Sequence, residues 1–163
     1  MQRFIIIIFL ALSVLLALSF NAHATVRISY FYDGDTVKIL DDTNEYRLRI
    51  TNIDAPERNQ PYGKKSRRAL MQLCEAAEIT VRITGTDKYQ RKLGKLYCDE
   101  KNVAEFMLKN GHAWFNDRYS TDLVLALKER SAREKKLGLW NDEKPTAPWV
   151  WRRQIKERQK NNR

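Results

Sequence analysis

The chain has 163 residues, of which 43% are hydrophobic, and a formal net charge of +10. It is large enough for one domain whose core needs no metal or disulfide to fold. Its two cysteines form no CxxC motif and it has only two histidines, which argues against a thiolate or imidazole zinc site, so any metal chemistry would use oxygen ligands.

Residues 1–24 have the pattern of a signal peptide. Arg3 precedes an apolar run from Phe4 to Phe20, and the following segment ends in the Ala-x-Ala site Ala22-His23-Ala24. We expect cleavage near Ala24 and export to the periplasm or the extracellular medium. The alternative is an uncleaved membrane anchor, because the run is close to the lower length limit for spanning a bilayer.

The rest of the chain alternates between strand and helix patterns. Apolar residues at every second position predict strands over 26–32, 37–39, 46–50, 79–83 and 93–98. A helical repeat begins near Ser66, a second helix follows the capping-box pair Asn102 and Glu105, and a third extends from about Ser120 to Lys136. Five strands with helices after the third and fifth predict an α+β fold, a small and partly open oligonucleotide-binding-fold β-barrel with three α-helices.

The charge is concentrated at the C-terminal end. We expect a barrel domain over 25–143 and a basic extension over 144–163. The extension contains seven Lys and Arg residues and a single acidic residue, Glu157. Such an extension suits a polyanion, either nucleic acid or an anionic membrane, and otherwise would be a solvated tail. Trp149 and Trp151 indicate that part of the extension docks on the domain, and the remainder would trail from the domain.

The two cysteines permit two interpretations. Cys74 lies on the apolar stripe of the first predicted helix, and Cys98 shares a strand face with Leu96. Export to an oxidising compartment permits a disulfide between them. Two small buried thiols are equally compatible with the pattern.

Three carboxylates are the candidates for chemistry. Asp35 has the same strand parity as Val37 and should point into the barrel mouth, although Asp33-Gly34 also reads as a plain hairpin turn. Asp54 and Glu57 resemble a capping box, but Pro61 interrupts any helix that would follow. Without His or Cys nearby, three carboxylates suit a hard cation such as calcium, with magnesium and manganese as the alternatives. Placing Arg49 beside Asp54 requires a bend near Thr51.

Six motifs in order across the mature chain resemble the staphylococcal nuclease (thermonuclease) family. They lie at 33–36 (DGDT), 47–57 (RLRI with IDAPE), 86–91 (TDKYQR), 110–114 (NGHAW), 137–140 (LGLW) and 148–153 (PWVWRR). The resemblance implies a calcium-dependent nuclease that hydrolyses DNA and RNA to 3′-phosphate ends. The chain departs from the family prototype at Ala55, which replaces Thr, at Gln90, which replaces Gly, and in a shorter loop over 57–62.

The resemblance also implies roles for single residues. Asp35 and Asp54 would bind Ca²⁺ through carboxylates and Ala55 through its carbonyl. The implied catalytic residues are Arg49, Glu57 and Arg91, and the residues near the bound nucleotide are Lys88, Tyr89 and Tyr119. We expect single-stranded substrates to be preferred, because aromatic and basic residues share the 86–91 loop, and we expect the protein to act as a monomer without a stable protein partner.

Two other functions compete with this interpretation. The same fold binds single strands without cleaving them, so the chain could be a non-catalytic nucleic-acid-binding barrel. A cationic envelope protein that binds anionic lipid would explain the basic extension, but it would leave the acidic residues unexplained.

Overall fold

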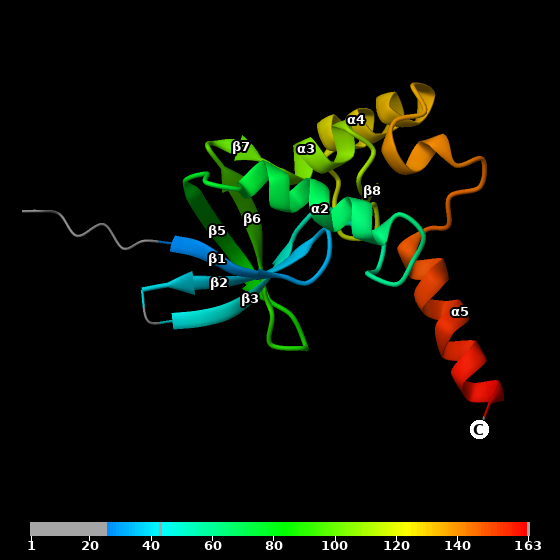
Figure 1. Cartoon of the computed structure of the whole chain (residues 1–163), viewed down its shortest axis with the longest axis horizontal. Helices are drawn as coiled ribbons and strands as arrows, with labels where there is room; N and C mark the ends of the chain where they lie inside the picture. Colours follow the sequence, from blue (N-terminus) through cyan, green and yellow to red (C-terminus); the bar gives the residue numbers. More distant parts are fainter. Residues whose placement is uncertain (1–25, 43, 163) are drawn as a thin grey trace, which may run out of the picture.

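A computed structural model describes residues 26–42 and 44–162, which form a curved sheet covered on one side by helices (Figure 1). The predicted signal peptide and its cleavage site lie outside the described residues. Within the described ranges, none of the helices combines the length and apolar character needed to cross a membrane.

The main sheet follows the predicted strands. Its hydrogen-bonded order is β1-β2-β3-β6-β5, and the short β7 pairs with β6. The bounds are β1 Val26–Phe31, β2 Thr36–Asp41, β3 Asn44–Ile50, β5 Ile79–Thr86, β6 Lys92–Cys98 and β7 Lys101–Asn102. All pairings are antiparallel except β3 with β6. Because β1 and β5 stand at the two ends of this order, the sheet is a partly open barrel, and the α+β fold class is confirmed.

The alternation of residues decides which side of the sheet is buried. Val37, Ile39, Leu48 and Ile50 are fully buried and face the helices, and Leu96 joins them from β6. A small second sheet pairs β4 (Ile53–Asp54) with β8 (Trp114–Phe115). This short pairing places Asp54 next to the core, where its carboxylate pairs with Arg49 of β3.

The three predicted helices are present, although the first starts earlier and the third later than the patterns indicated. They are α2 (Gly63–Cys74), α3 (Val103–Lys109) and α4 (Leu123–Glu134). Asn102 caps α3 by accepting from the Glu105 N–H at 3.2 Å, as the capping-box pattern predicted. Helix α4 starts later than expected because the Asp122 side chain, not Ser120, accepts from its first free N–H groups.

The C-terminal extension contains a further helix that the sequence patterns did not predict. A short 3₁₀ segment, η1 (Gly138–Asn141), is followed by α5 (Pro148–Asn161), a fourth α-helix within the described residues. Pro148 stands at its first position, where a missing N–H costs nothing. The count of three helices was therefore too low, and Trp149 and Trp151 lie in the first turn of a helix.

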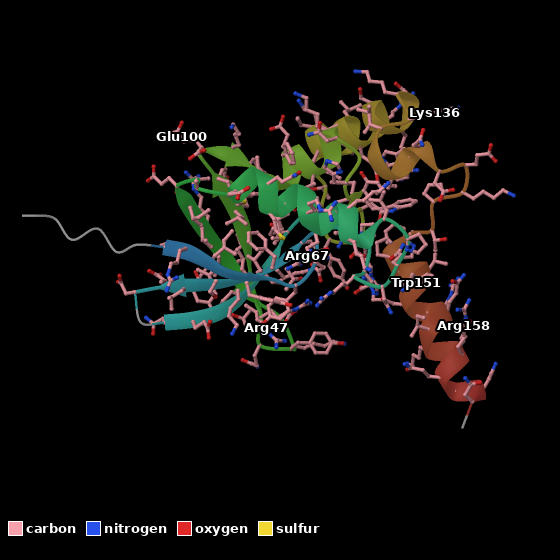
Figure 2. All side chains as sticks on the ribbon, in the orientation of Figure 1. Arg47, Arg67, Glu100, Lys136, Trp151 and Arg158 are labelled. Atoms are coloured by element: carbon pink, nitrogen blue, oxygen red, sulfur yellow. A yellow bond between two sulfur atoms is a disulfide. The ribbon has the colours of Figure 1, made fainter. Side chains whose placement is uncertain are left out.

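Helix α5 is fixed at its N-terminal end and then projects away from the barrel (Figure 1). Pro148 is buried, and Val150 packs against a cluster that contains Trp114, Trp140 and Leu139. Figure 2 shows Trp151 where α5 meets the body and Arg158 farther along the helix. The basic residues of the last turns are therefore exposed.

A disulfide joins Cys74, the last residue of α2, to Cys98 at the end of β6. The two Cα atoms are 5.1 Å apart, within the range that a disulfide allows. This bond decides between the two interpretations of the cysteines. It fastens α2 to the sheet, and α2 in turn supports the loops that carry the acidic residues.

Candidate active site

Asp35 is positioned by the turn between β1 and β2. The Asp33 side chain accepts from the backbone N–H groups of Asp35 and Thr36 at 2.9 and 2.7 Å. Gly34 allows the turn to pack against α2, since a Cβ there would lie 2.0 Å from the Ser66 hydroxyl. Burial, together with the Asp35 charge, raises the pKa of Asp33 to about 8. Residues 33–36 therefore form a turn, as the Asp33-Gly34 pair indicated, and this turn also directs Asp35 toward the protein interior.

The Asp35 carboxylate is 4% exposed and faces inward, as its strand parity predicted. It accepts from the Ala55 N–H at 2.6 Å and from the Thr36 hydroxyl at 2.9 Å. Its remaining partner is the Arg49 guanidinium, whose Nε lies 3.1 Å from Oδ1. A buried carboxylate with these partners is paired, so its desolvation is compensated.

A bend between β3 and β4 brings Asp54 to the same place. The chain turns at Thr51 and Asn52, and Asn52 has a left-handed φ of 70°. Asp54 then returns alongside β3 and accepts from Arg49 Nη2 at 3.1 Å. The bend that the sequence required near Thr51 is therefore present, and strict alternation does not apply across it.

Arg49 is the centre of this cluster. Its side chain is 14% exposed, and besides the two carboxylates it donates to the backbone carbonyls of Ile50 and Ile53 at 2.5 and 2.8 Å. A guanidinium can serve these acceptors at once because its donors form a planar fork. Asp35, Arg49 and Asp54 thus form one buried charged cluster.

Glu57 lies at the edge of the cluster on a tight loop. Its N–H donates to the Gln60 side chain at 3.1 Å, and its carbonyl accepts from the Gln60 N–H at 2.9 Å. Gly63 packs directly on that carbonyl, since a Cβ there would come within 1.8 Å of it. The Glu57 side chain is about one-third exposed, and its carboxylate is linked to that of Asp54 by a shared partner.

That shared partner is Arg152 of α5, which the sequence analysis did not select. Its Nη2 lies 2.6 Å from Asp54 Oδ2, and its Nη1 lies 3.1 Å from Asp54 Oδ1 and 2.8 Å from Glu57 Oε1. Hydrogen bonds to Asp54 and then to Glu57 raise the pKa of Arg152 above its usual value. The sequence offered two signals for it: its place in the 148–153 motif (PWVWRR), and its position four residues after Pro148, because proline is common at the first position of a helix.

Arg91, the other arginine of the predicted catalytic set, is not paired with the charged cluster in the described part of the chain. It is the last residue of the 86–91 loop, and its guanidinium pairs with Asp87 at 2.8 Å, four residues earlier. Burial would raise the pKa of Asp87, but hydrogen bonds from Arg91 and Tyr89 lower it. None of the ion pairs found among the described residues joins Arg91 to Asp35, Asp54 or Glu57.

The predicted substrate-binding residues are on the surface. Tyr89 is 68% exposed, and the Lys88 ammonium lies 5.1 Å from its ring centroid. Tyr119 is 76% exposed and lies in the segment before α4, with the Arg118 guanidinium 5.6 Å from its ring. All three side chains are free to meet a ligand, but no contact within the described residues joins them to the charged cluster.

The cluster fits a hard cation only in part. Among residues 26–42 and 44–162, no three His, Cys, Asp or Glu side chains lie close enough to form a complete metal site. Asp35 and Asp54, however, are two buried carboxylates linked by one guanidinium, with Ala55 directly beside Asp35. Calcium takes about six to eight oxygen ligands, so waters, backbone carbonyls and substrate oxygens would have to supply those that the two carboxylates do not. The donor set therefore fits such an ion.

Comparison with known proteins points to one family. A sequence model described as a staphylococcal nuclease homologue matches residues 47–142. The chain is 41% identical over 127 residues, 77% of its length, to a protein named as an uncharacterized endonuclease from Escherichia coli O157:H7, of which it covers 83%.

Two further relatives agree. A protein from Haemophilus influenzae, also named as an uncharacterized endonuclease, is 37% identical over 133 residues, which are 81% of this chain and 75% of that protein. A staphylococcal-like nuclease of Arabidopsis thaliana is 39% identical over 109 residues, which are 67% of this chain and 34% of that protein.

Proposed function

The chain belongs to the staphylococcal nuclease family, and we propose that it is an exported, calcium-dependent nuclease that hydrolyses phosphodiester bonds of DNA and RNA to leave 3′-phosphate ends. The observation that carries this proposal is the cluster of Asp35, Arg49 and Asp54, with Glu57 linked to it by a shared guanidinium. Phosphodiester hydrolysis needs acidic ligands for a cation, donors for phosphate oxygens and a base for water, and the cluster contains each type.

The cation would be held by Asp35 and Asp54 through their carboxylates and by Ala55 through its carbonyl. When bound, calcium would neutralise the non-bridging oxygens of the phosphodiester. The oxygen-only donor set favours calcium over zinc or other metals that prefer imidazole and thiolate. Burial of the two carboxylates strengthens their attraction for a divalent ion.

Glu57 would position and deprotonate the attacking water. Its side chain is about one-third exposed and shares the Arg152 guanidinium with Asp54, which supports a place near the cation that Asp54 would hold. Arg49 and Arg91 would support the negative charge that develops on phosphorus and on the leaving oxygen. For Arg91 this role requires the guanidinium to turn from Asp87 toward the phosphate, a movement of a side chain on an exposed loop.

Two surfaces suit a single strand. Lys88, Tyr89 and Tyr119 offer exposed rings and a cation. A groove of about 1230 Å³ has Glu57 in its lining, together with Tyr62, Trp151 and several lysines. Aromatic rings that accept any base, together with basic groups for the backbone, support single-stranded DNA and RNA as substrates. The proposal includes an enzyme that acts as a monomer.

Export is supported by the disulfide between Cys74 and Cys98, because such bonds form and persist in oxidising compartments. This agrees with the signal-peptide pattern of residues 1–24. Periplasmic and extracellular locations are both oxidising, so the proposal covers either. Fractionation of a producing cell, with immunodetection of the protein, would contradict it if the intact chain remained in the cytoplasm.

The activity is tested by digestion of single-stranded DNA with calcium and with chelator. Glu57→Ala is the test variant, and Glu134→Ala, which removes an exposed carboxylate on α4, is the matched control. We expect calcium-dependent cleavage by the wild type and the control and its loss in Glu57→Ala, with 3′-phosphate on the products. DNA binding without cleavage in calcium would instead identify a non-catalytic nucleic-acid-binding barrel.

A further inference from the structure

Arg152 lies outside the part of the chain that the family model matches, yet its guanidinium is within hydrogen-bond distance of two of the predicted active-site carboxylates. We propose that Arg152 is the resident counter-cation of Asp54 and Glu57, and that it sets the affinity of the site for calcium by competing with the ion. The inference rests on the proposed function, because it assumes that the divalent ion binds Asp54.

The Arg152 guanidinium and a calcium ion cannot both be bound to the carboxylate of Asp54. Both oxygens of Asp54 already accept from Arg152, one at 2.6 Å and the other at 3.1 Å. A calcium ligand distance is about 2.3–2.6 Å, so an ion on these oxygens would lie within a few ångströms of the guanidinium. Two positive groups at such a distance repel each other, and both would need the same oxygens of Asp54. Arg152 must therefore leave Asp54 when the ion binds.

Arg49 also contacts Asp54, but its surroundings hold it in place. It is 14% exposed and donates to two backbone carbonyls, of Ile50 and Ile53, in addition to the carboxylates. Arg152 is 48% exposed, and the partners found for its guanidinium among the described residues are Asp54 and Glu57 alone. Of the two guanidiniums, Arg152 is the one that can move at low cost.

Helix α5 can stay docked while the Arg152 side chain leaves. The helix is held at its beginning by burial of Pro148, by packing of Val150 and by a hydrogen bond of 3.4 Å from Trp151 Nε1 to Asn59 Oδ1. These contacts do not involve the guanidinium. Since the Arg152 side chain is half exposed, rotation of its long stem can carry the charge into solvent.

The exchange has a consequence for the protein without calcium. Arg152 then neutralises Asp54 and Glu57, so the acidic centre is stable before any ion arrives. The stabilisation that Arg152 provides must be given up on calcium binding. This cost lowers calcium affinity, and removal of Arg152 should raise it.

The test is calorimetric titration of calcium into the purified protein without nucleic acid. Arg152→Ala is compared with the wild type and with Arg153→Ala, a control that removes an exposed arginine of the same charge from the next position of α5. We expect the Kd for calcium to fall by about 10-fold or more in Arg152→Ala, because bidentate charge-assisted pairs are among the strong hydrogen bonds. The control should stay within about twofold of the wild type, as expected for an exposed charge.

A structural role alone would give a different result. If Arg152 only stabilised the fold, its removal would leave calcium affinity unchanged or weaken it, and either outcome overturns the proposal. The calcium-induced rise in melting temperature is a second readout and should be larger in Arg152→Ala than in the wild type. Should that variant fail to fold, Arg152→Gln keeps a polar, flexible side chain and removes the charge, and the same tighter binding is expected.

The outcomes also separate this inference from the proposed function. Equal calcium affinity in the wild type and in Arg152→Ala overturns the competition and leaves a calcium-dependent nuclease. Absence of calcium binding from all three proteins overturns both proposals. Binding that is detectable only in Arg152→Ala supports both.

Discussion

Removal of the Arg49 side chain should separate the structural and the catalytic roles of the charged cluster. In Arg49→Ala, Asp35 loses the one ion-pair partner found for it among the described residues, and Asp54 keeps Arg152. Leaving a buried charge unpaired costs about 3–5 kcal/mol, and because one of the two carboxylates remains paired we expect a loss near 3 kcal/mol in the free energy of unfolding. Urea denaturation in the presence of chelator measures this loss.

Calcium provides the internal control for this prediction. A divalent ion bound by Asp35 and Asp54 would replace the missing positive charge, so calcium should stabilise Arg49→Ala more than it stabilises the wild type. Arg47→Ala on the same strand removes an exposed guanidinium that donates to the Tyr32 hydroxyl, and it should cost less than about 1 kcal/mol. Equal losses in the two variants would refute the reasoning that the cluster is buried and mutually paired.

The same variant tests the chemistry. A preorganised donor in the transition state is worth about 3–4 kcal/mol, so Arg49→Ala should lower kcat by about 10²–10³ even with calcium and under conditions where the variant is folded. Arg49→Lys should recover only part of kcat, because an ammonium lacks the planar fork. A kcat close to that of the wild type would contradict the assigned role.

Three further outcomes are expected. Reduction of the Cys74–Cys98 disulfide, or replacement of both residues by Ala, should lower the free energy of unfolding by about 3 to 4 kcal/mol, measured by urea denaturation. Burial lowers the pKa of His112 below 6.5, so stability should fall as the pH drops below 6.5 toward the lowered value, where the unfolded chain binds the proton more readily, and His112→Gln should flatten that slope. Truncation after Arg152 should make oligonucleotide binding less steeply dependent on salt, and an unchanged slope would show that α5 does not touch the strand.

Local rules were enough to predict the acidic half of the site. The inward direction of Asp35 followed from strand parity, and the packing of Asp54 beside Arg49 required only that the strand bend near Thr51. The interruption after Glu57 also followed, because Pro61 prevents a helix there, although Gly63, which the pattern also treated as a breaker, is the first residue of α2. These features depend on residues within about twenty positions of one another, where alternation and turn residues carry the information.

Arg152 could not be found in that way, because its contact with Asp54 spans 98 positions of sequence. Trp149 and Trp151 alternate, which suggested no helix, although Pro148 at a first helical position was an available signal. Which side chains a terminal helix presents to a distant loop depends on where that helix docks. Docking is decided by the packing of Val150 and the tryptophan cluster, and no local pattern encodes it.

The loop that carries Glu57 shows why the C-terminal segment belongs to the active site. Gln60 of that loop is 6% exposed and donates to the Thr146 carbonyl at 2.6 Å, and Asn59 accepts from Trp151. The loop that carries Glu57 lies before the expected boundary at residue 143, and the residues that hold this loop in place, Thr146 and Trp151, lie after it. A chain ended at that boundary would keep Asp35, Arg49 and Asp54 in place, but the Glu57 loop would lose three contacts, including the one that Arg152 makes with its carboxylate.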